Sequence, residues 1–527
     1  MNRRRFLTTG ATATAAIATP GFITFDLGSP DTLTALAIDS AADIDAFGTD
    51  GNPSFLAPCE TEADRDALIE FVEDEADGRV IRTYEHVDQI VFSVPWEHAG
   101  RTTRFSIRTY GGGLEDLDYV SWADANAFLP RTEPFEPDTL ESRSEVSFRD
   151  ALNRREQIVL GLRDVFGASV TDTAGLAFDG DAEEATLQDA RELVNASQST
   201  LDGVDTSDVT VAVIDTGANG RSPFDDDEDE SRIHPASTDF TTAGDPTVEE
   251  NGESAVSDSD GHGDWVAMCI ASNHSDVRYR GFVPDADLLI AKSLDDGTGS
   301  TADIVAGIEL AIDVGADVAC LSLGSPMWSQ ALVDALEKAY EAGVLPVCAL
   351  GNDRFGSVFA ANPASAPEGF AVAATNVPES GAREDTRVAY FSNVGPHPGT
   401  TDLSDGDSQD GGEPKLGAPG MNISIDPVGT LSGTSMAAPM VAGAAAVLRA
   451  DGHDVEESWR RLTEYAYPIP GAGETEIGYG LLDLEAALNE DEIEERQPDV
   501  RDDDATARDA WHNLVSNTKG RRLAGLF

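Results

Sequence analysis

From about residue 190 onward, short, fully apolar segments alternate with amphipathic ones in this 527-residue chain, and this alternation limits the folds open to it. The apolar segments have the length of strands; they are residues 209–214, 288–292, 318–323, 345–349 and 370–374. Apolar residues at helical spacing lie between them, at 302–314 and 330–342. Strands that are apolar on both sides must be covered on both faces. The pattern therefore predicts an α/β fold, a doubly wound, mostly parallel sheet with helices on both faces.

Sheets of this kind carry their chemistry beyond the carboxyl ends of the strands, and Asp215 directly follows the first apolar segment. His262 lies between two glycines before an apolar helical stretch, and Ser435 stands at the start of a helix of small residues. A serine hydroxyl is a poor nucleophile until an imidazole takes its proton, and a carboxylate must hold the other imidazole nitrogen. Asp215, His262 and Ser435 are therefore candidate catalytic residues for amide hydrolysis.

The sequences around these residues resemble those of the subtilisin-like serine proteases, the subtilases. They read VAVIDTG at 211–217, DGHGDWVA at 260–267 and LSGTSMAAPMVAG at 431–443. The order Asp, His, Ser along the chain is also that of subtilisin. The resemblance covers residues 190–488 and implies a subtilisin-like catalytic domain there. It further implies that Asp215 orients the histidine, that His262 is the general base and then the acid, and that Ser435 is the nucleophile.

The same resemblance extends to the rest of the active site. The sequence ALGN at 349–352 resembles the family's oxyanion segment, which implies that the Asn352 side-chain amide and the Ser435 backbone N–H stabilise the oxyanion. Two more segments resemble the edges that bind an extended substrate between them; these are Ser322, Leu323 and Gly324, and Gly297, Thr298 and Gly299. Main-chain pairing accepts many sequences, so we expect broad endoproteolysis of protein or peptide substrates. The resemblance implies no cofactor for catalysis.

Two residues depart from the family pattern, because Asp264 and Trp265 follow His262-Gly263 where family members usually have threonine and histidine. The additional carboxylate could shift the pKa of His262, and the indole changes the packing beneath it. Neither departure removes a catalytic atom. Two alternatives nevertheless stay open: an inactive protein of the same fold that only binds its target, and a narrow processing protease for one exported partner.

Acidic residues dominate the composition, with 97 Asp and Glu against 35 Lys and Arg and a net charge of −62. This charge repels a phosphate backbone, so we exclude nucleic acid as a partner. Only four of the basic residues are lysines. A lysine-poor acidic chain resembles proteins of salt-in halophiles, in which molar salt screens the repulsion to about 3 Å. We therefore expect a salt-adapted, halolysin-like enzyme; the alternative is an acidic secreted protein that does not need salt.

The N-terminus predicts export. Residues 3–7 read RRRFL and precede a weakly apolar stretch that reaches Pro20, which resembles a twin-arginine signal over residues 1–25. Threonine and glycine interrupt this stretch, whereas a membrane anchor needs about 20 predominantly apolar residues. We expect a secreted monomer without a stable membrane anchor, and a basic terminus with no targeting role is the alternative.

A separate small unit precedes the catalytic domain. Residues 64–75 have helical spacing, 79–84 and 89–95 have strand patterns, and 103–107 and 118–122 are further strand candidates. One helix with three or four strands predicts a small α+β unit over residues 54–127. This unit resembles the inhibitory prodomains of subtilases, which implies a self-processed zymogen with its own prodomain as intramolecular inhibitor.

The processing point of such a zymogen could lie anywhere from residue 124 to residue 190. Residues 128–189 are a linker or an insertion of unclear structure, with one helical pattern at 149–165. Residues 489–527 form an acidic C-terminal tail that is too short for a domain.

The cysteines and acidic clusters define no firm metal site. The four cysteines lack CxxC spacing and lie in apolar runs, which predicts buried free thiols; they are Cys59, Cys269, Cys320 and Cys348. A Cys320–Cys348 disulfide is the alternative. The acidic run 225–230 could hold structural calcium through its oxygen atoms, as subtilases often do, but we prefer a solvated loop.

Overall fold

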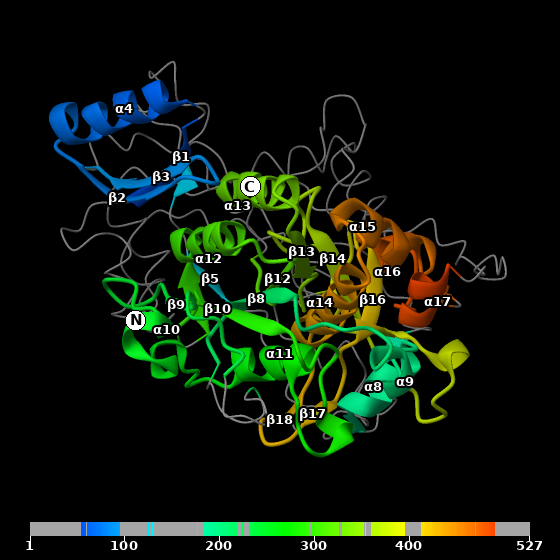
Figure 1. Cartoon of the computed structure of the whole chain (residues 1–527). Helices are drawn as coiled ribbons and strands as arrows, with labels where there is room; N and C mark the ends of the chain where they lie inside the picture. The colour runs from blue at the N-terminus through cyan, green and yellow to red at the C-terminus, as the bar shows by residue number, and fades with distance from the viewer. Residues whose placement is uncertain are drawn as a thin grey trace, which may run out of the picture.

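The computed structural model describes residues 54–59, 61–94, 124–125, 128–130, 176–177, 184–218, 224, 231–295, 297–325, 329–352, 354, 360–395, 413–469 and 471–490. These residues form a small α+β unit near the N-terminus and a large α/β unit that follows it (Figure 1). Several predicted features lie outside the described residues: the export signal, the strands at 103–107 and 118–122, the helix at 149–165, the acidic run at 225–230 and the C-terminal tail beyond 490. The predicted domain boundaries stay predictions.

A nine-stranded sheet is the centre of the large unit in the described part of the chain. Six neighbouring strands are parallel, in the order β14 (Phe370–Thr375), β13 (Leu345–Ala349), β12 (Val318–Leu321), β8 (Thr210–Asp215), β10 (Asp287–Lys292) and β9 (Thr238–Asp239). At β14 the sheet continues with β16 (Leu416–Pro419), which is parallel to β14, and with β15 (Val388–Ala389), which is antiparallel to it. The edge strand β6 (Leu176–Ala177) is parallel to β15. The five predicted strands are thus β8, β10, β12, β13 and β14, with small shifts at their ends.

Helices cover both faces of this sheet, as the apolar strands require. On one face α12 (Thr301–Val314) packs beside α13 (Gln330–Glu341), and on the other α11 (His262–Ala271) packs beside α14 (Thr434–Ala450) (Figure 1). The strand residues between these layers are fully buried, from Val211 in β8 to Val347 in β13. The prediction of a doubly wound α/β sheet is therefore confirmed.

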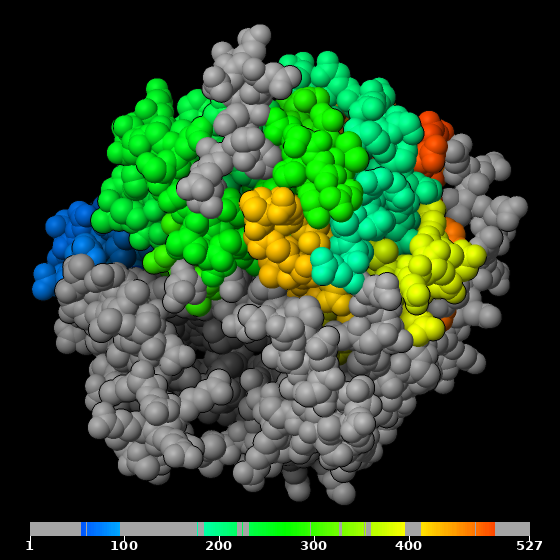
Figure 2. Space-filling model, turned by 90° about the horizontal axis from the view of Figure 1, so that it is seen from below, coloured from blue at the N-terminus to red at the C-terminus, as the bar shows by residue number. Residues whose placement is uncertain are grey.

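Shorter elements surround this core. The hairpin of β17 (Ile423–Ile425) and β18 (Gly429–Leu431) pairs with β7 (Ala185–Thr186), which leads into α8 (Leu187–Leu193) and α9 (Gln198–Leu201). Figure 2 shows this hairpin in gold, between the surface of α8 and α9 in teal and the surface of the segment that contains α11 in green. The other short elements of the large unit are α10 (Val248–Asn251), η5 (Glu253–Val256), η6 (Val277–Tyr279), η7 (Arg383–Asp385), α16 (Glu474–Ile477) and α17 (Leu484–Asn489).

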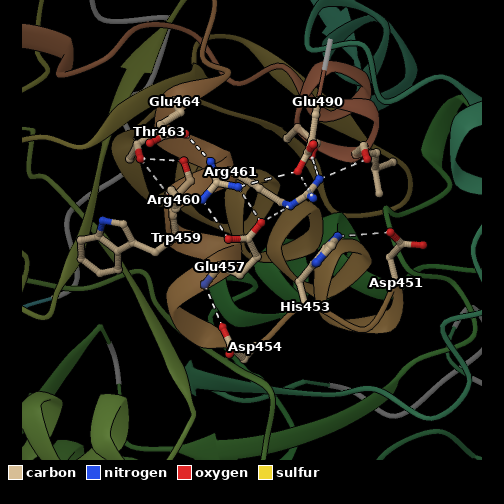
Figure 3. A network of polar contacts seen from close by, with 12 residues as sticks. Asp451, His453, Asp454, Glu457, Trp459, Arg460, Arg461, Thr463, Glu464 and Glu490 are labelled. Atoms are coloured by element: carbon tan, nitrogen blue, oxygen red, sulfur yellow. Dashed lines mark hydrogen bonds and ion pairs between the residues drawn. The ribbon is translucent and has the colours of Figure 1, made fainter. Parts of the chain in front are cut away.

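Two adjacent arginines on α15 (Val455–Glu464) attach α17, the last helix of the described residues, to the domain (Figure 3). Arg460 and Arg461 both contact the Glu457 carboxylate, at 2.6 and 2.7 Å. Arg461 also donates to the carbonyl oxygens of Ala487 and Leu488, at 2.8 and 3.2 Å. Because the last carbonyl groups of a helix have no intrahelical partner, Arg461 closes the C-terminal end of α17.

The small unit is an antiparallel sheet with one helix on it. The sheet has the order β2 (Arg79–Tyr84), β3 (Gln89–Ser93), β1 (Ser54–Pro58) and β4 (Asp124–Ala125), and α4 (Glu62–Glu70) continues as the π-turn η1 (Phe71–Glu75). Phe55, Leu68 and Phe92 form its own core. The opposite face of the sheet, with Tyr84 and Val91, joins the core of the large unit at α12 and α13 (Figure 1). Sequence patterns predict the helix, β2 and β3, but not β1.

Candidate active site

The end of β8 and the start of α11 bring Asp215 and His262 together. Nδ1 of His262 lies 2.7 Å from Oδ1 of Asp215, and both side chains are 0% exposed. The same Oδ1 accepts the backbone N–H of Thr216 at 2.7 Å, which fixes the carboxylate. A carboxylate at this distance holds the imidazole in one orientation and leaves Nε2 on the opposite side for proton transfer.

The turn before His262 is held by a second carboxylate, Asp258. Its oxygen atoms accept the backbone N–H groups of Asp260, Gly261 and Asp264, at 2.8, 2.9 and 2.9 Å. Gly261 adopts a φ of 96°, which favours glycine. Asp258 is 7% exposed, so these bonds lie in a shielded environment. Asp258 is not among the residues predicted from the sequence, although it is an acid four residues before a glycine-flanked histidine.

The two residues that depart from the family pattern are both buried. Trp265 is 0% exposed and belongs to the main core, and its predicted effect on the packing beneath His262 stays a prediction. Asp264 is 8% exposed, and its backbone N–H belongs to the Asp258 network. The predicted effect of Asp264 on the pKa of His262 stays a prediction.

Ser435 lies in the first turn of α14, where the sequence analysis expects it. Its Oγ donates to the carbonyl oxygen of Ser322 at 3.1 Å, and Oγ of Ser322 donates back to the carbonyl oxygen of Ser435 at 3.0 Å. His262 Nε2 is buried and has no hydrogen-bond partner among the described residues. Catalytic hydrogen bonds often form only when substrate is bound, so this arrangement is compatible with His262 and Ser435 acting as a pair.

Asn352 follows β13 and lies against the same end of α14. Its Oδ1 accepts the backbone N–H and the hydroxyl of Thr434, at 2.8 and 2.9 Å. The Thr434 hydroxyl in turn accepts the backbone N–H of Gly351 at 3.0 Å. Because the amide oxygen is bound to Thr434, the amide N–H groups are directed to the other side of the side chain. The sequence analysis missed Thr434, which it quoted only as part of a motif.

The two predicted substrate edges lie in different surroundings. Ser322 is in contact with Ser435, and the neighbouring Leu323 is fully buried. The other edge, Gly297 to Gly299, leads into β11 (Thr298–Ser300). This strand pairs antiparallel with β5 (Phe128–Pro130), in the register Thr298 to Pro130, Gly299 to Leu129 and Ser300 to Phe128. A segment of the chain itself therefore occupies the edge that the sequence analysis assigns to a substrate.

Cysteines and acidic residues form no further site in the described part of the chain. All four cysteines are free and buried, so the alternative Cys320–Cys348 disulfide is absent. Among the described residues no group of three or more His, Cys, Asp and Glu is placed to hold a metal ion. A search of the same residues for a helix with the length and hydropathy of a membrane span finds none.

The sequence of this chain is similar to those of known proteins. Residues 206–465 match the subtilase family. The major intracellular serine protease of Bacillus subtilis (strain 168) is 34% identical over 289 residues, which are 53% of this chain and 79% of that protein. The chain belongs to the subtilase family. Subtilisin Savinase of Lederbergia lenta is 33% identical to this subtilase over 294 residues, covering 54% of the chain and 92% of that protein.

A solved structure agrees with this family at the level of the fold. Fervidolysin from Fervidobacterium pennivorans, a keratinolytic enzyme related to subtilisin, superposes with a TM-score of 0.55. The alignment covers 83% of this chain and 61% of that chain, at 21% identity. The subtilase described here is thus a subtilisin-like serine endopeptidase with the α/β fold of that class.

Proposed function

We propose that this subtilase is a secreted, salt-adapted endopeptidase made as a self-processed zymogen, with Asp215, His262 and Ser435 as its catalytic residues. The observation that carries the catalytic part is the 2.7 Å contact between Nδ1 of His262 and Oδ1 of Asp215, with both side chains shielded from water. Ser435 begins a helix that packs against α11, the helix that His262 opens. These three residues supply the nucleophile, the base and the group that orients the base.

The chemistry then proceeds in two halves. Ser435 Oγ attacks the substrate carbonyl while His262 Nε2 takes its proton, and Asp215 stabilises the resulting imidazolium. The imidazolium protonates the leaving amine, which departs and leaves an acyl-enzyme. Water then attacks the ester, with His262 again as base, and releases the acid and the free Ser435. We propose that no cofactor takes part in these steps.

Two donors stabilise the oxyanion that forms in each half. The Ser435 N–H lies in the first helical turn, where backbone donors lack intrahelical acceptors. The Asn352 amide is the second donor, oriented by the contacts of its oxygen with Thr434. In subtilisin, loss of the corresponding asparagine lowers kcat by about 10²–10³-fold. We propose the same role for Asn352.

The zymogen part of the proposal rests on how the small unit meets the large one. The turn between β2 and β3 presents three backbone N–H groups, from Glu85, His86 and Val87, to the carboxylate of Glu309 on α12, at 2.7 to 3.0 Å. The Tyr84 hydroxyl donates to the carbonyl oxygen of Ala302 at 2.5 Å, in a buried position. The buried Tyr84 contact and the convergence of three backbone donors on Glu309 support a specific inhibitory prodomain.

The pairing of β5 with β11 supports inhibition by occupation of the substrate edge. Because β5 occupies that edge, we propose that the first cleavage takes place on the C-terminal side of Pro130. The next segments belong to the large unit, since β6 pairs with β15 and β7 pairs with β17. We therefore narrow the processing window to residues 131–175, inside the wider range that the sequence allows.

Export and salt adaptation rest on the sequence. The twin-arginine pattern at 3–7 supports secretion, and such routes carry folded cargo, which suits an inhibited precursor. A net charge of −62 destabilises a compact state in dilute buffer and is screened in molar salt. Protein and peptide substrates, and a monomeric enzyme, complete the proposal.

Casein hydrolysis in multimolar salt tests the proposal, with purified precursor and its Ser435→Ala variant followed on a gel. We expect the wild type to shorten itself, with a new N-terminus within 131–175, and to degrade casein in the presence of EDTA, while the variant stays full length. A mature enzyme that keeps residues 54–94 contradicts the zymogen proposal. Full activity in dilute buffer contradicts salt adaptation. A wild type that labels with a serine-directed probe but spares casein indicates a narrow processing protease.

A further inference from the structure

The oxyanion segment is held on both sides of Asn352. On the N-terminal side, Gly351 has a φ of 110°, and a Cβ there would lie 2.3 Å from Nδ2 of Asn393, so the close approach requires glycine. The carbonyl oxygen of Gly351 accepts the backbone N–H of Asn393 at 2.9 Å. Thr434 holds the Asn352 amide oxygen. These contacts fix the segment up to Asn352, whereas the residues after Asn352 are held by other contacts.

On the C-terminal side the segment is anchored by Arg354, two residues after Asn352. The backbone N–H of Arg354 donates to the carbonyl oxygen of Phe391 at 3.1 Å. Its guanidinium donates to the carbonyl oxygen of Ser392 at 3.5 Å and forms an ion pair with Glu476. The Arg354 side chain is only 5% exposed. A charged side chain buried to this degree needs a partner of opposite charge, and Glu476 supplies it.

Glu476 is itself fixed by the short helix α16. Its side chain is 12% exposed, and Oε2 accepts the backbone N–H of Gly473 at 3.0 Å, which closes the start of the helix. The carbonyl oxygen of Thr475 accepts the backbone N–H of Gly395 at 2.8 Å. The helix α16 is therefore tied to the same 391–395 segment that flanks the oxyanion segment. One oxygen of Glu476 serves the helix and the other serves Arg354.

We propose that the Arg354–Glu476 ion pair is a positioning element for oxyanion stabilisation, which sets the place of the Asn352 amide from the side that Thr434 does not control. The inference rests on the proposed role of Asn352. Only one residue separates Asn352 from Arg354, so the Cα atoms of the two residues are at most about 8 Å apart along the main chain, and a shift of Arg354 displaces the main chain next to Asn352. An oxyanion donor must lie within about 2.7–3.1 Å of the oxyanion, and a misplacement of about 1 Å can lower kcat about 10²-fold.

Removal of either partner should therefore lower kcat more than it raises KM. Arg354→Met removes the charge and keeps the length of the side chain. Glu476→Gln removes the charge of the partner but keeps an oxygen for the Gly473 N–H, so it is the milder change if Arg354→Met fails to fold. We expect kcat to fall about 10–100-fold in each variant with KM changed less than about twofold.

A matched control is the ion pair of Arg383 with Asp483, whose atoms lie 2.6 Å apart with side chains 18% and 7% exposed. Arg383 also donates to the carbonyl oxygen of Leu482 at 3.3 Å, so it resembles Arg354 in its set of partners. Its contacts in the described part of the chain are with Asp483, Leu482 and the ring of Tyr467, none of which belongs to the oxyanion segment. Arg383→Met should lower thermal stability and leave kcat of the folded enzyme unchanged.

The deciding experiment is a double-mutant cycle with Asn352→Ala, in molar salt on a chromogenic peptide. Each full-length variant is matured by immobilised wild-type enzyme, which is then filtered off. If Arg354 acts through Asn352, adding Arg354→Met or Glu476→Gln to Asn352→Ala lowers kcat by less than about threefold further. Losses that multiply in the double variants, or single variants with unchanged kcat, overturn the inference.

The proposed function fails in a different way. If Asn352→Ala alone leaves kcat unchanged, the assigned role of Asn352 is wrong, and the ion pair has no oxyanion donor to position. If Asn352→Ala lowers kcat but the cycle is multiplicative, the role of Asn352 stands and only the positioning inference fails. Circular dichroism and the melting temperature of every variant show that the comparison is between folded proteins.

Discussion

Substitution of Glu309 by glutamine should loosen the small unit from the catalytic domain. The Glu309 carboxylate is half-exposed on α12 and accepts the N–H groups of Glu85, His86 and Val87 at 2.7 to 3.0 Å. Glutamine keeps one acceptor oxygen, removes the charge and directs an NH₂ group at one of these donors. The backbone amides of the turn then lose the acceptor that fixes them to the catalytic domain.

The expected magnitude follows from these contacts. A hydrogen bond to a charged group contributes about 1.5–3 kcal/mol, and solvent at a half-exposed site reduces this. Loss of the charge together with one or two of the bonds should cost about 2–3 kcal/mol of docking free energy. Since about 1.4 kcal/mol corresponds to tenfold in an equilibrium constant, undocking should become about 30–150-fold more favourable.

Amide hydrogen exchange in the full-length Ser435→Ala chain, which cannot process itself in our account, measures this effect. The amides of Glu85, His86 and Val87 should lose about 30–150-fold of their protection in Glu309→Gln. Asp313→Asn is the control, because among the described residues the Asp313 carboxylate contacts the His86 side chain alone, at 3.3 Å, and Asp313 is exposed. Unchanged protection in Glu309→Gln, or an equal loss in Asp313→Asn, refutes the reasoning.

Burial raises the pKa of Asp303, 3.8 Å from Arg82 of the small unit, to about 6. The charge of Arg82 lowers this pKa, so Arg82→Met should raise it further and keep the Asp303 carboxyl protonated to a higher pH; an NMR pH titration of Asp303 in both full-length proteins measures this, and an unchanged or lower pKa in Arg82→Met contradicts it. Arg461→Met should lower the free energy of unfolding by about 1–3 kcal/mol in a denaturant titration, because it removes bonds to the end of α17. A native protein at pH 8 should resist thiol reagents, because burial raises the pKa of Cys320 to about 12 and that of Cys59 to about 11; rapid labelling contradicts this.

Much of the fold follows from local patterns in the sequence. Strands such as β13 and β12 are buried on both faces, so their apolar runs mark them without ambiguity. The ends of α12 are equally local, since Ser300 accepts the Asp303 N–H at 3.1 Å and Gly315 ends the helix with a φ of 76°. The strand β1 was not predicted. Ser54–Pro58 is a short apolar stretch that pairs with residues more than thirty positions later, and no local sequence pattern indicates such a distant partner.

The candidate site residues were predicted from sequence motifs. The motifs do not include the hydrogen bonds and ion pairs that orient these residues. Asp258 accepts hydrogen bonds from three backbone N–H groups. Every residue except proline has such a group, so a sequence pattern does not indicate which of them Asp258 binds. The ion pair of Arg354 with Glu476 joins residues 122 positions apart. Such pairs depend on tertiary packing, which periodicity and spacing do not encode. The contact of Glu309 with the small unit could not be predicted for the same reason, because in the sequence Glu309 resembles any solvated acid on an amphipathic helix.

The central claim is that Ser435 is the nucleophile of this subtilase, and covalent labelling tests it most directly. Wild-type protein and the Ser435→Ala variant are treated with a serine-directed fluorophosphonate in molar salt, digested and mapped by mass spectrometry. We expect one adduct, on the peptide that contains Ser435, and no adduct in the variant. An adduct on another residue, or peptide hydrolysis by the folded variant at the wild-type rate, would contradict it.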